Sequence, residues 1–168
     1  MIVAIVAVDE NWGIGKDNQL LCRIPDDLKR FKNLTEDNIV IMGRGTFESL
    51  GRKTLPNRTN IIITHNTWKF GSPDTHNEIL MDMDEAKKYI ATYCGDKNIF
   101  IIGGESIYKQ LLPMCSTVFV TKIHKSFSAD RFFPNLDTDV RWKCISDSAK
   151  IDNYGELRYS YHTYEQAV

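Results

Sequence analysis

The sequence predicts one α/β domain around a central mixed sheet of about eight strands, mostly parallel and flanked by helices. Three observations support this fold class. The chain has 168 residues, within the range of one compact domain. Most strand-like segments are continuous apolar runs separated by helix-like segments, a pattern typical of parallel sheets that are covered on both faces. The C-terminal segment alternates polar and apolar residues, which predicts antiparallel strands at one edge of the sheet.

Apolar runs, together with the glycines and prolines that interrupt them, predict the first elements of the chain. A buried strand is predicted at 2–8, because IVAIVAV is an uninterrupted apolar run. A long glycine-containing loop at 9–23 comes next, and Pro25 in the first turn marks a helix at 25–35. We then expect strands at 38–42, 59–64 and 78–81, a short helix in GRGTFESL, a polar turn-rich loop at 65–77, and a helix at 83–94.

The last third continues the alternation and then changes pattern. We expect a strand at 98–102, paired glycines, a helix ending at Leu112, and a strand at 117–123. The tail holds two further strand candidates, around WKCIS and ELRYSYHTYE. The second alternates strongly, so its apolar residues share one face.

Composition and charge argue against several classes of partner. The net charge is −1, with 21 basic and 22 acidic side chains, which indicates neither a nucleic-acid ligand nor an anionic membrane surface. The N-terminal apolar run is too short to span a bilayer and lacks the features of a signal peptide. Cys22, Cys94, Cys115 and Cys144 show no metal-ligand spacing, so we expect free thiols, no metal site and a cytoplasmic protein.

The helix at 25–35 places its two neighbouring acids on different faces. At about 100° per residue, Ile24, Leu28, Phe31 and Leu34 form one apolar stripe. Asp27 projects roughly 45° from the centre of that stripe, whereas Asp26 projects roughly 145° away, toward solvent. A carboxylate on an apolar face either pairs inside the core or faces a ligand in an apolar cleft. The helix alone leaves both interpretations open.

Two junctions between a strand and a helix carry glycines. In VIMGRGTFESLG, residues 40–51, a buried strand ends in Gly43-Arg44-Gly45-Thr46, and in residues 98–113 another ends in Gly103-Gly104. Free N–H groups at a helix start suit phosphate, and two such junctions in one small domain favour a dinucleotide. Neither matches the Rossmann or P-loop pattern, so those two folds are disfavoured, and each junction alone is also consistent with an ordinary glycine turn. The loop at 9–23 is either a functional lid or a mobile surface loop.

Taken together, these segments resemble the dihydrofolate reductase family. The segments IGKDNQL, IPDDLKRFK, VIMGRGTFESLGR, LPNRTNIIIT, IIGGESIY and VTKI occur in the family's order, and the resemblance covers nearly the whole chain. It implies that NADPH reduces 7,8-dihydrofolate to 5,6,7,8-tetrahydrofolate, with hydride transfer to C6 and protonation of N5 by way of water. That reaction supports one-carbon metabolism and thymidylate synthesis, and antifolates would inhibit it. The resemblance also implies an adenosine-binding subdomain at roughly 38–95.

The resemblance assigns residues to both ligands. The catalytic residues would be Asp27, Thr121 and Leu20. The substrate would contact Ile5, Asp27, Leu28, Phe31, Lys32, Leu50, Arg58 and Thr121, with Arg58 binding the glutamate α-carboxylate. The cofactor would contact Ala7, Ile14, Gly15, Asn18, Leu20, Gly43, Arg44, Gly45, Thr46, Thr64, His65, Ile102, Gly103, Gly104, Glu105, Ser106, Ile107 and Tyr108. Within that set Arg44, Thr64 and His65 would hold the 2′-phosphate, and the Gly103-Gly104 peptide would be cis.

Two departures from the family pattern stand out. Leu21-Cys22 replaces the usual Pro-Trp before the acidic helix, which changes the partner of the water near the acid. GRKTLPNR is one residue longer than the commonest spacing before Arg58. Two alternatives remain: a reductase of riboflavin synthesis with the same fold, which would not be expected to show Asp27 with Arg58, and a pteridine- or nucleotide-binding protein with little catalysis. We expect a monomer, since no long apolar surface stripe stands out.

Overall fold

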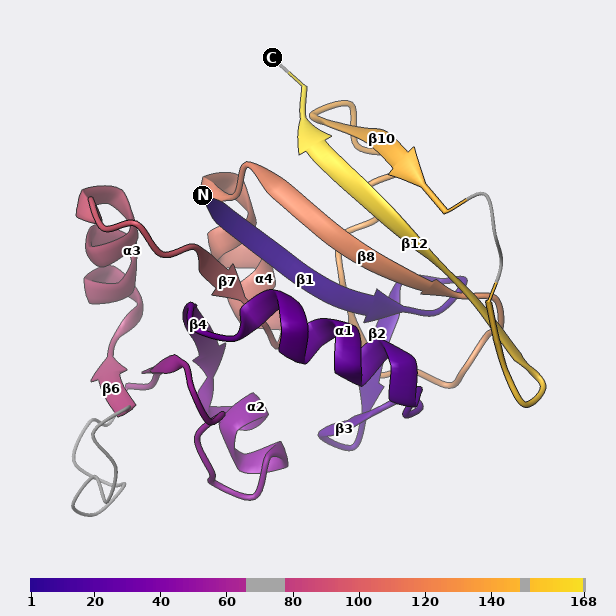
Figure 1. The fold of residues 1–168 in the computed structure, drawn as a ribbon, viewed down its shortest axis with the longest axis horizontal. Helices are drawn as coiled ribbons and strands as arrows, with labels where there is room; N and C mark the ends of the chain where they lie inside the picture. Colours follow the sequence, from indigo (N-terminus) through magenta and orange to yellow (C-terminus); the bar gives the residue numbers. More distant parts are fainter. Residues whose placement is uncertain (66–77, 149–151, 168) are drawn as a thin grey trace.

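A computed structural model describes residues 1–65, 78–148 and 152–167, and Figure 1 shows their arrangement. The strands are β1 (Ile2–Val8), β2 (Gly13–Lys16), β3 (Gln19–Leu20), β4 (Ile39–Gly43), β5 (Thr59–Ile63), β6 (Glu78–Met81), β7 (Ile99–Ile101), β8 (Thr117–Ile123), β9 (Arg131–Phe132), β10 (Trp142–Asp147), β11 (Asp152–Tyr154) and β12 (Leu157–Gln166). The helices are α1 (Pro25–Thr35), α2 (Arg44–Ser49), α3 (Met83–Thr92), α4 (Glu105–Leu111) and the 3₁₀ turn η1 (Leu112–Met114).

The central sheet has the order β10-β12-β8-β1-β7-β4-β5-β6, and β11 pairs with β12 beside it. Every pair from β8 to β6 along this order is parallel. The C-terminal β12 is antiparallel to both β8 and β10. The predicted fold class is therefore confirmed, including the antiparallel strands at one edge.

Different helices cover the two faces of the sheet. Because side chains alternate along each strand, neighbouring residues of one strand pack against different helices. In β4, Ile39 and Ile41 join the apolar cluster that contains residues of α3 and α4. Val40 and Met42 of the same strand join a second cluster, which includes Phe47 of α2 and partly buried residues of α1. This two-sided burial explains why β4 reads as a continuous apolar run.

The long loop predicted at 9–23 is wrong in one respect, because it contains two strands. β2 and β3 pair across the turn Asp17-Asn18, and β2 also pairs with β9, which forms a small three-stranded sheet. Asp17 and Asn18 both have positive φ angles, 50° and 59°, as a tight two-residue hairpin requires. The adjacent Asp and Asn were the signal in the sequence that could have revealed this hairpin.

Other differences are small. The helix predicted at 83–94 ends at Thr92, and β9 and β11 are short strands that no apolar pattern predicted. Of the loop predicted at 65–77, all but His65 lies outside the described residues. All four cysteines have free thiols, as expected. No helix in the described part of the chain is long and apolar enough to cross a membrane.

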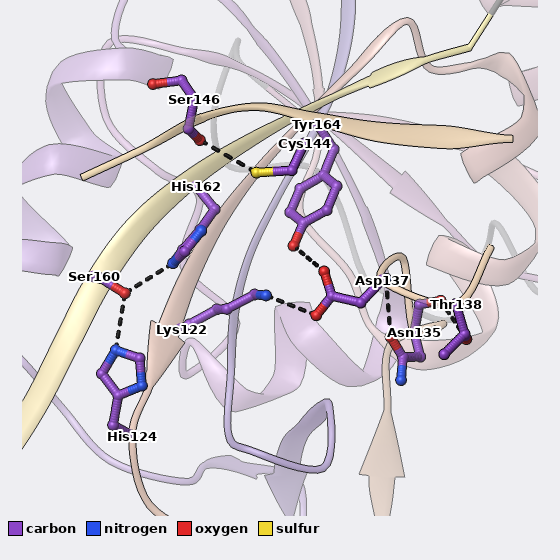
Figure 2. Close-up of polar contacts among 10 residues, drawn as sticks. All are labelled: Lys122, His124, Asn135, Asp137, Thr138, Cys144, Ser146, Ser160, His162 and Tyr164. Carbon is purple, nitrogen blue, oxygen red and sulfur yellow. Dashed lines mark hydrogen bonds and ion pairs between the residues drawn. The ribbon is translucent and has the colours of Figure 1, made fainter. Parts of the chain in front are cut away.

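A polar network links Lys122 of β8, Tyr164 of β12 and Asp137 (Figure 2). Lys122 follows Thr121, the residue that bonds Asp27 of α1, so the network lies on the opposite face of the sheet from α1. Lys122 donates to Asp137 at 2.8 Å, and the Tyr164 hydroxyl donates to the same carboxylate at 2.6 Å. The Lys122 ammonium also lies 5.3 Å from the ring centroid of Trp12. These contacts join the C-terminal strand to the segment that leads into the lid hairpin, which we define as β2 and β3.

Candidate functional site

Two adjacent cavities lie at the carboxyl ends of the parallel strands, where open α/β sheets bind ligands. The large cavity has a volume of about 620 Å³ and is lined by the ends of β4 and β5, the starts of α2 and α4, and the lid hairpin. The small cavity has a volume of about 220 Å³ and is lined by α1, the second half of β1 and the end of β8. The large cavity lies in the range of about 300–1,000 Å³ that small-molecule sites occupy.

Asp27 lies in the wall of the small cavity. Its Oδ1 accepts a hydrogen bond of 2.5 Å from the hydroxyl of Thr121, a residue of β8 that is 2% exposed. Burial raises the pKa of Asp27 above its ordinary value, and the Thr121 hydrogen bond and the Arg30 charge act in the opposite direction. Asp27 thus pairs with the core and also faces a cavity, so the two interpretations left open by the sequence both describe part of its environment. Asp26 is exposed, as predicted.

The predicted apolar walls of the substrate site line the small cavity. Ile5, Leu28, Phe31 and Leu50 all belong to its lining. Leu28 is 39% exposed although it lies on the apolar stripe of α1, because that part of the stripe faces the cavity rather than packed side chains.

Cys22 also lines the small cavity, next to Asp27. It is half-buried, and burial together with the nearby charge of Asp27 raises the pKa of its thiol. It packs beside a small apolar cluster formed by Ile24, Ile123 and Tyr159. The side chain that replaces the expected tryptophan is therefore a neutral thiol in the wall of the site, where it can donate only a weak hydrogen bond.

The structure does not bring Lys32 or Arg58 into the lining of either cavity. Lys32 is exposed. Arg58 is 6% exposed and donates to the Pro56 carbonyl at 2.9 Å and to the Thr35 hydroxyl at 3.0 Å. Its guanidinium carbon lies 6.0 Å from the ring centroid of Phe31, which does line the small cavity. Arg58 is therefore held immediately behind the cavity wall.

The large cavity contains both predicted strand–glycine–helix junctions. The glycines Gly43 and Gly104 precede α2 and α4, and within the described part of the chain no side chain caps either helix. By contrast, Asp82 and Glu85 cap α3 reciprocally. A hydrogen bond of 2.8 Å from the Gly43 N–H to the Gly103 carbonyl joins the two junctions.

The backbone of these junctions requires glycine. A Cβ atom on Gly43 would lie 2.8 Å from Cγ1 of Ile107. Gly103 has a φ of +114°, in the region that favours glycine, and its peptide bond with Gly104 is cis, as the family resemblance predicted. The result is a glycine-lined floor that a ligand can approach closely.

The charge of the large cavity suits a polyanionic ligand. Among the described residues its lining contains the basic side chains Lys16, Arg44, His65 and Arg131, against one acid, Glu105. Arg44 currently donates to Glu48 at 2.9 Å. Phosphates of a dinucleotide would fit both these basic side chains and the uncapped starts of α2 and α4.

Most predicted cofactor residues are brought together by the fold. All of those predicted line the large cavity except Gly103, which lies just behind it. Lining residues that the sequence did not indicate are Val6, Lys16, Gln19, Ser49, Ile63, Met83, Gln110 and Arg131. Lys16 and Arg131 come from the small sheet, whose pairing between distant segments leaves no motif in the sequence.

The two cavities share a wall. Residues that line both are Val6, Ala7, Ile14, Gln19, Leu20, Thr46, Ser49, Ile102 and Tyr108. A ligand in the large cavity would therefore lie next to a ligand in the small one, along a wall of apolar and uncharged polar side chains that includes both strands of the lid hairpin. This geometry suits direct transfer between two bound molecules.

Comparison with known proteins agrees with this geometry. A family model described as dihydrofolate reductase matches residues 1–166. A dihydrofolate reductase of Bacillus subtilis is 38% identical over 167 residues, covering 99% of this chain and 95% of that protein. One from Staphylococcus haemolyticus is 39% identical over 166 residues, covering 98% and 95%. A solved structure of the Enterococcus faecalis dihydrofolate reductase, complexed with NADP(H) and RAB-propyl, has a TM-score of 0.83 and 35% identity, covering 100% of this chain and 97% of that one. This chain belongs to the dihydrofolate reductase family.

Proposed function

We propose that this protein reduces 7,8-dihydrofolate to 5,6,7,8-tetrahydrofolate with NADPH, in support of one-carbon metabolism and thymidylate synthesis. The observation that carries the proposal is the pair of cavities with a common wall: one is basic and glycine-lined, and the other is largely apolar, with Asp27 as the one carboxylate among its described lining residues. The family assignment and the NADP(H) complex of the Enterococcus faecalis relative support the same conclusion.

In the small cavity, Asp27 binds the amidine-like edge of the pterin, its 2-amino group and ring N3. An ionised carboxylate can accept both N–H groups at once in strong charge-assisted hydrogen bonds. Thr121 holds the carboxylate in place through its hydrogen bond of 2.5 Å. Leu28, Phe31 and Leu50 exclude water from the faces of the pterin and the benzoyl group. For the glutamate α-carboxylate we propose Arg58 as the partner, with Lys32 beside it, although this structure holds Arg58 behind the cavity wall and Lys32 outside the lining of both cavities.

The shared wall fixes the reaction geometry. NADPH supplies the hydride when it is bound. Ala7, Ile14 and Leu20 position the two rings against one another, which places C6 for hydride transfer. Asp27 contacts the opposite edge of the pterin from N5, so water delivers the proton there. Leu20, the last residue of β3 in the lid hairpin and 54% exposed, controls the access of that water.

The adenosine half of the cofactor is held by residues 38–95. The uncapped start of α2 binds one side of the pyrophosphate, and Gly104, Glu105, Ser106 and Ile107 line the other side. Arg44, Thr64 and His65 line the same cavity and bind the 2′-phosphate, which favours NADPH over NADH. The protein acts as a monomer in the cytoplasm, and light scattering of the purified protein tests its oligomeric state.

The direct test mixes pure protein, NADPH and dihydrofolate and follows the loss of NADPH absorbance, with and without methotrexate. Methotrexate-sensitive turnover is expected. Dihydrofolate binding without turnover would reject the catalytic proposal and leave a pteridine-binding protein.

Asp27 provides the sharper test, with a matched control in the next residue. Asp27→Asn should keep the fold and NADPH binding, lose activity near neutral pH, and recover part of it as the pH falls and substrate arrives protonated. Asp26→Asn changes an exposed acid on the same helix and should leave the activity unchanged. Full activity of Asp27→Asn near neutral pH would show that another group fills this role.

The cofactor preference has its own control pair. Arg44→Gln should narrow the preference for NADPH over NADH, because Arg44 lines the large cavity. Arg52→Gln removes a second cation that lies 3.6 Å from the same Glu48 but does not line that cavity, and should leave the preference intact. Equal effects of both substitutions would contradict the assignment of Arg44.

A further inference from the structure

Arg30 is a half-buried cation close to Asp27 that does not belong to the lining of either cavity. It lies three residues after Asp27 on α1, so the two side chains share one side of the helix. Its guanidinium carbon lies 4.2 Å from the ring centroid of Tyr161 and 5.6 Å from that of Phe119. Both distances suit cation–π contacts.

The strands that hold Arg30 also hold the hydrogen-bond partner of Asp27. Tyr161 of β12 lies directly opposite Thr121 of β8 in the sheet. Phe119 precedes Thr121 by two residues on the same strand, so both point to the same face. The two aromatic rings that hold Arg30 and the hydroxyl that bonds Asp27 are therefore parts of one rigid surface.

We propose that Arg30 is a positioning residue whose charge, held on Tyr161 and Phe119, keeps Asp27 ionised for binding the pterin. It acts through Asp27 and does not touch the ligand. The effect of Arg30 on the ionisation of Asp27 does not depend on the proposed function. Only the statement that the ionised carboxylate binds a pterin rests on it.

The contact with two aromatic rings explains why the charge of Arg30 can still act on Asp27. A guanidinium paired with a second carboxylate would lose most of its effect on Asp27, whereas an aromatic face holds it without neutralising it. Burial favours the neutral form of Asp27 and raises its pKa, and the positive charge of Arg30 lowers it again. Since Arg30 is itself half-buried, solvent screens this interaction less than it would at the surface.

Among the described residues, the other groups near Asp27 are weaker candidates for this charge. Arg23 lines the same small cavity, but it is exposed, so solvent screens its charge more strongly than that of the half-buried Arg30. Cys22, from the segment before α1, carries a thiol whose pKa is raised by burial and by Asp27 itself, so it stays neutral near physiological pH. Burial and Asp27 raise the pKa of Tyr161 to about 12, so that phenol is neutral as well. Thr121 of β8 contributes a hydroxyl dipole and no net charge.

The test measures the ionisation of Asp27 directly, by carboxyl ¹³C NMR of the protein without ligands across a pH series. Arg30→Met removes the charge and keeps an apolar stem, and should move the midpoint of Asp27 to higher pH. Arg30→Lys keeps a charge and should leave the midpoint closer to that of the unmodified protein. Lys29→Met removes an exposed charge from the same helix and should leave it unchanged. If Arg30→Met is not folded by circular dichroism, Arg30→Gln takes its place.

Two results would overturn the proposal: a midpoint in Arg30→Met equal to that of the unmodified protein, or equal shifts in Arg30→Met and Arg30→Lys. The second would assign the effect to packing rather than charge. As a functional readout, the acid limb of the pH profile for methotrexate affinity should move upward with the NMR midpoint. The NMR titration needs no substrate, so it still decides the role of Arg30 if the turnover assay fails.

Discussion

The buried carboxylate of Asp9 offers a quantitative test of how the lid hairpin is anchored. Asp9 is 3% exposed and follows directly after β1. Its Oδ1 accepts from the N–H groups of Asn11 at 2.9 Å and Gly13 at 2.8 Å. Its Oδ2 accepts from the N–H of Phe127 at 3.0 Å. One side chain thus joins the base of the lid hairpin to the loop between β8 and β9.

The cost of Asp9→Ala can be worked from these three bonds. The Gly13 N–H is buried and would lose its acceptor, which costs about 1–3 kcal/mol. The N–H groups of Asn11 and Phe127 are partly buried, so water can replace the carboxylate there and each loss is about 1 kcal/mol. The free energy of unfolding should therefore fall by about 3–5 kcal/mol. For a urea slope of about 2 kcal/mol per molar, the midpoint should fall by about 2 M.

Urea unfolding at neutral pH measures this, together with NADPH affinity by fluorescence titration. Asp9→Asn keeps an acceptor for Asn11 and Gly13 but turns an NH₂ group toward the Phe127 N–H. It should therefore lower the free energy of unfolding by less than Asp9→Ala does. Asp96→Ala, at an exposed turn before β7, should change the stability by less than about 0.5 kcal/mol. A loss below about 1 kcal/mol in Asp9→Ala, with unchanged NADPH affinity, would refute the anchoring role.

Three further substitutions test the cavity floor and the network on the far face. Gly103→Ala should lower the thermal stability and the NADPH affinity, because φ is +114° and the new methyl group would lie 3.0 Å from the Tyr108 ring. A thermal-shift assay with and without NADPH measures both quantities, and an unchanged NADPH affinity would contradict the predicted clash. Tyr108→Phe removes the hydrogen bond of 2.7 Å to the Ile5 carbonyl and should lower the free energy of unfolding by about 1–2 kcal/mol in urea, whereas no loss would mean that the carbonyl finds another donor. Burial lowers the pKa of His162, so the unfolded state takes up its proton first as the pH falls, and the folded protein loses stability through the ordinary histidine range. The His162 ring lies 2.8 Å from the Ser160 hydroxyl (Figure 2), and His162→Gln keeps a polar neighbour there. This substitution should reduce the loss of stability between neutral pH and about pH 5, whereas an unchanged loss would exclude His162 as its source.

The parts of the site that the sequence predicts are those set by local periodicity. The turn of α1 alone separates Asp27 from Asp26, because side-chain direction on a helix follows from spacing. The two glycine junctions end neighbouring parallel strands, so the fold brings Gly43 and Gly104 to one cavity without further information. The prediction that Thr121 belongs to the site came from the family resemblance, since nothing in the pattern of β8 distinguishes this residue from its neighbours.

The parts that escape prediction depend on contacts between distant segments. Arg131 reaches the large cavity because β9 pairs with β2, where it lies opposite Gly15. Strands of two to four residues are too short to show a hydrophobic period, so only the Asp17-Asn18 turn marks this sheet in the sequence. The position of Arg58 behind the cavity wall depends in the same way on its hydrogen bond to Thr35 of α1.

The surface of the small cavity departs from the burial pattern of the rest of the fold, in which apolar side chains are mostly buried or half-buried and charged ones are mostly exposed. Leu20, Leu28 and Leu50 are 54%, 39% and 38% exposed, and all three line the small cavity. Beside them burial raises the pKa of Asp27, so its charged form is costly to hold there. Exposed leucines and a buried acid each cost stability, yet they lie against one another, where an apolar ring with an amidine edge would cover the first and pair with the second. A pterin bound as proposed above would offset both costs at once, and this proposal accounts for an acid on the apolar stripe of α1 better than a purely structural pairing with Thr121 does.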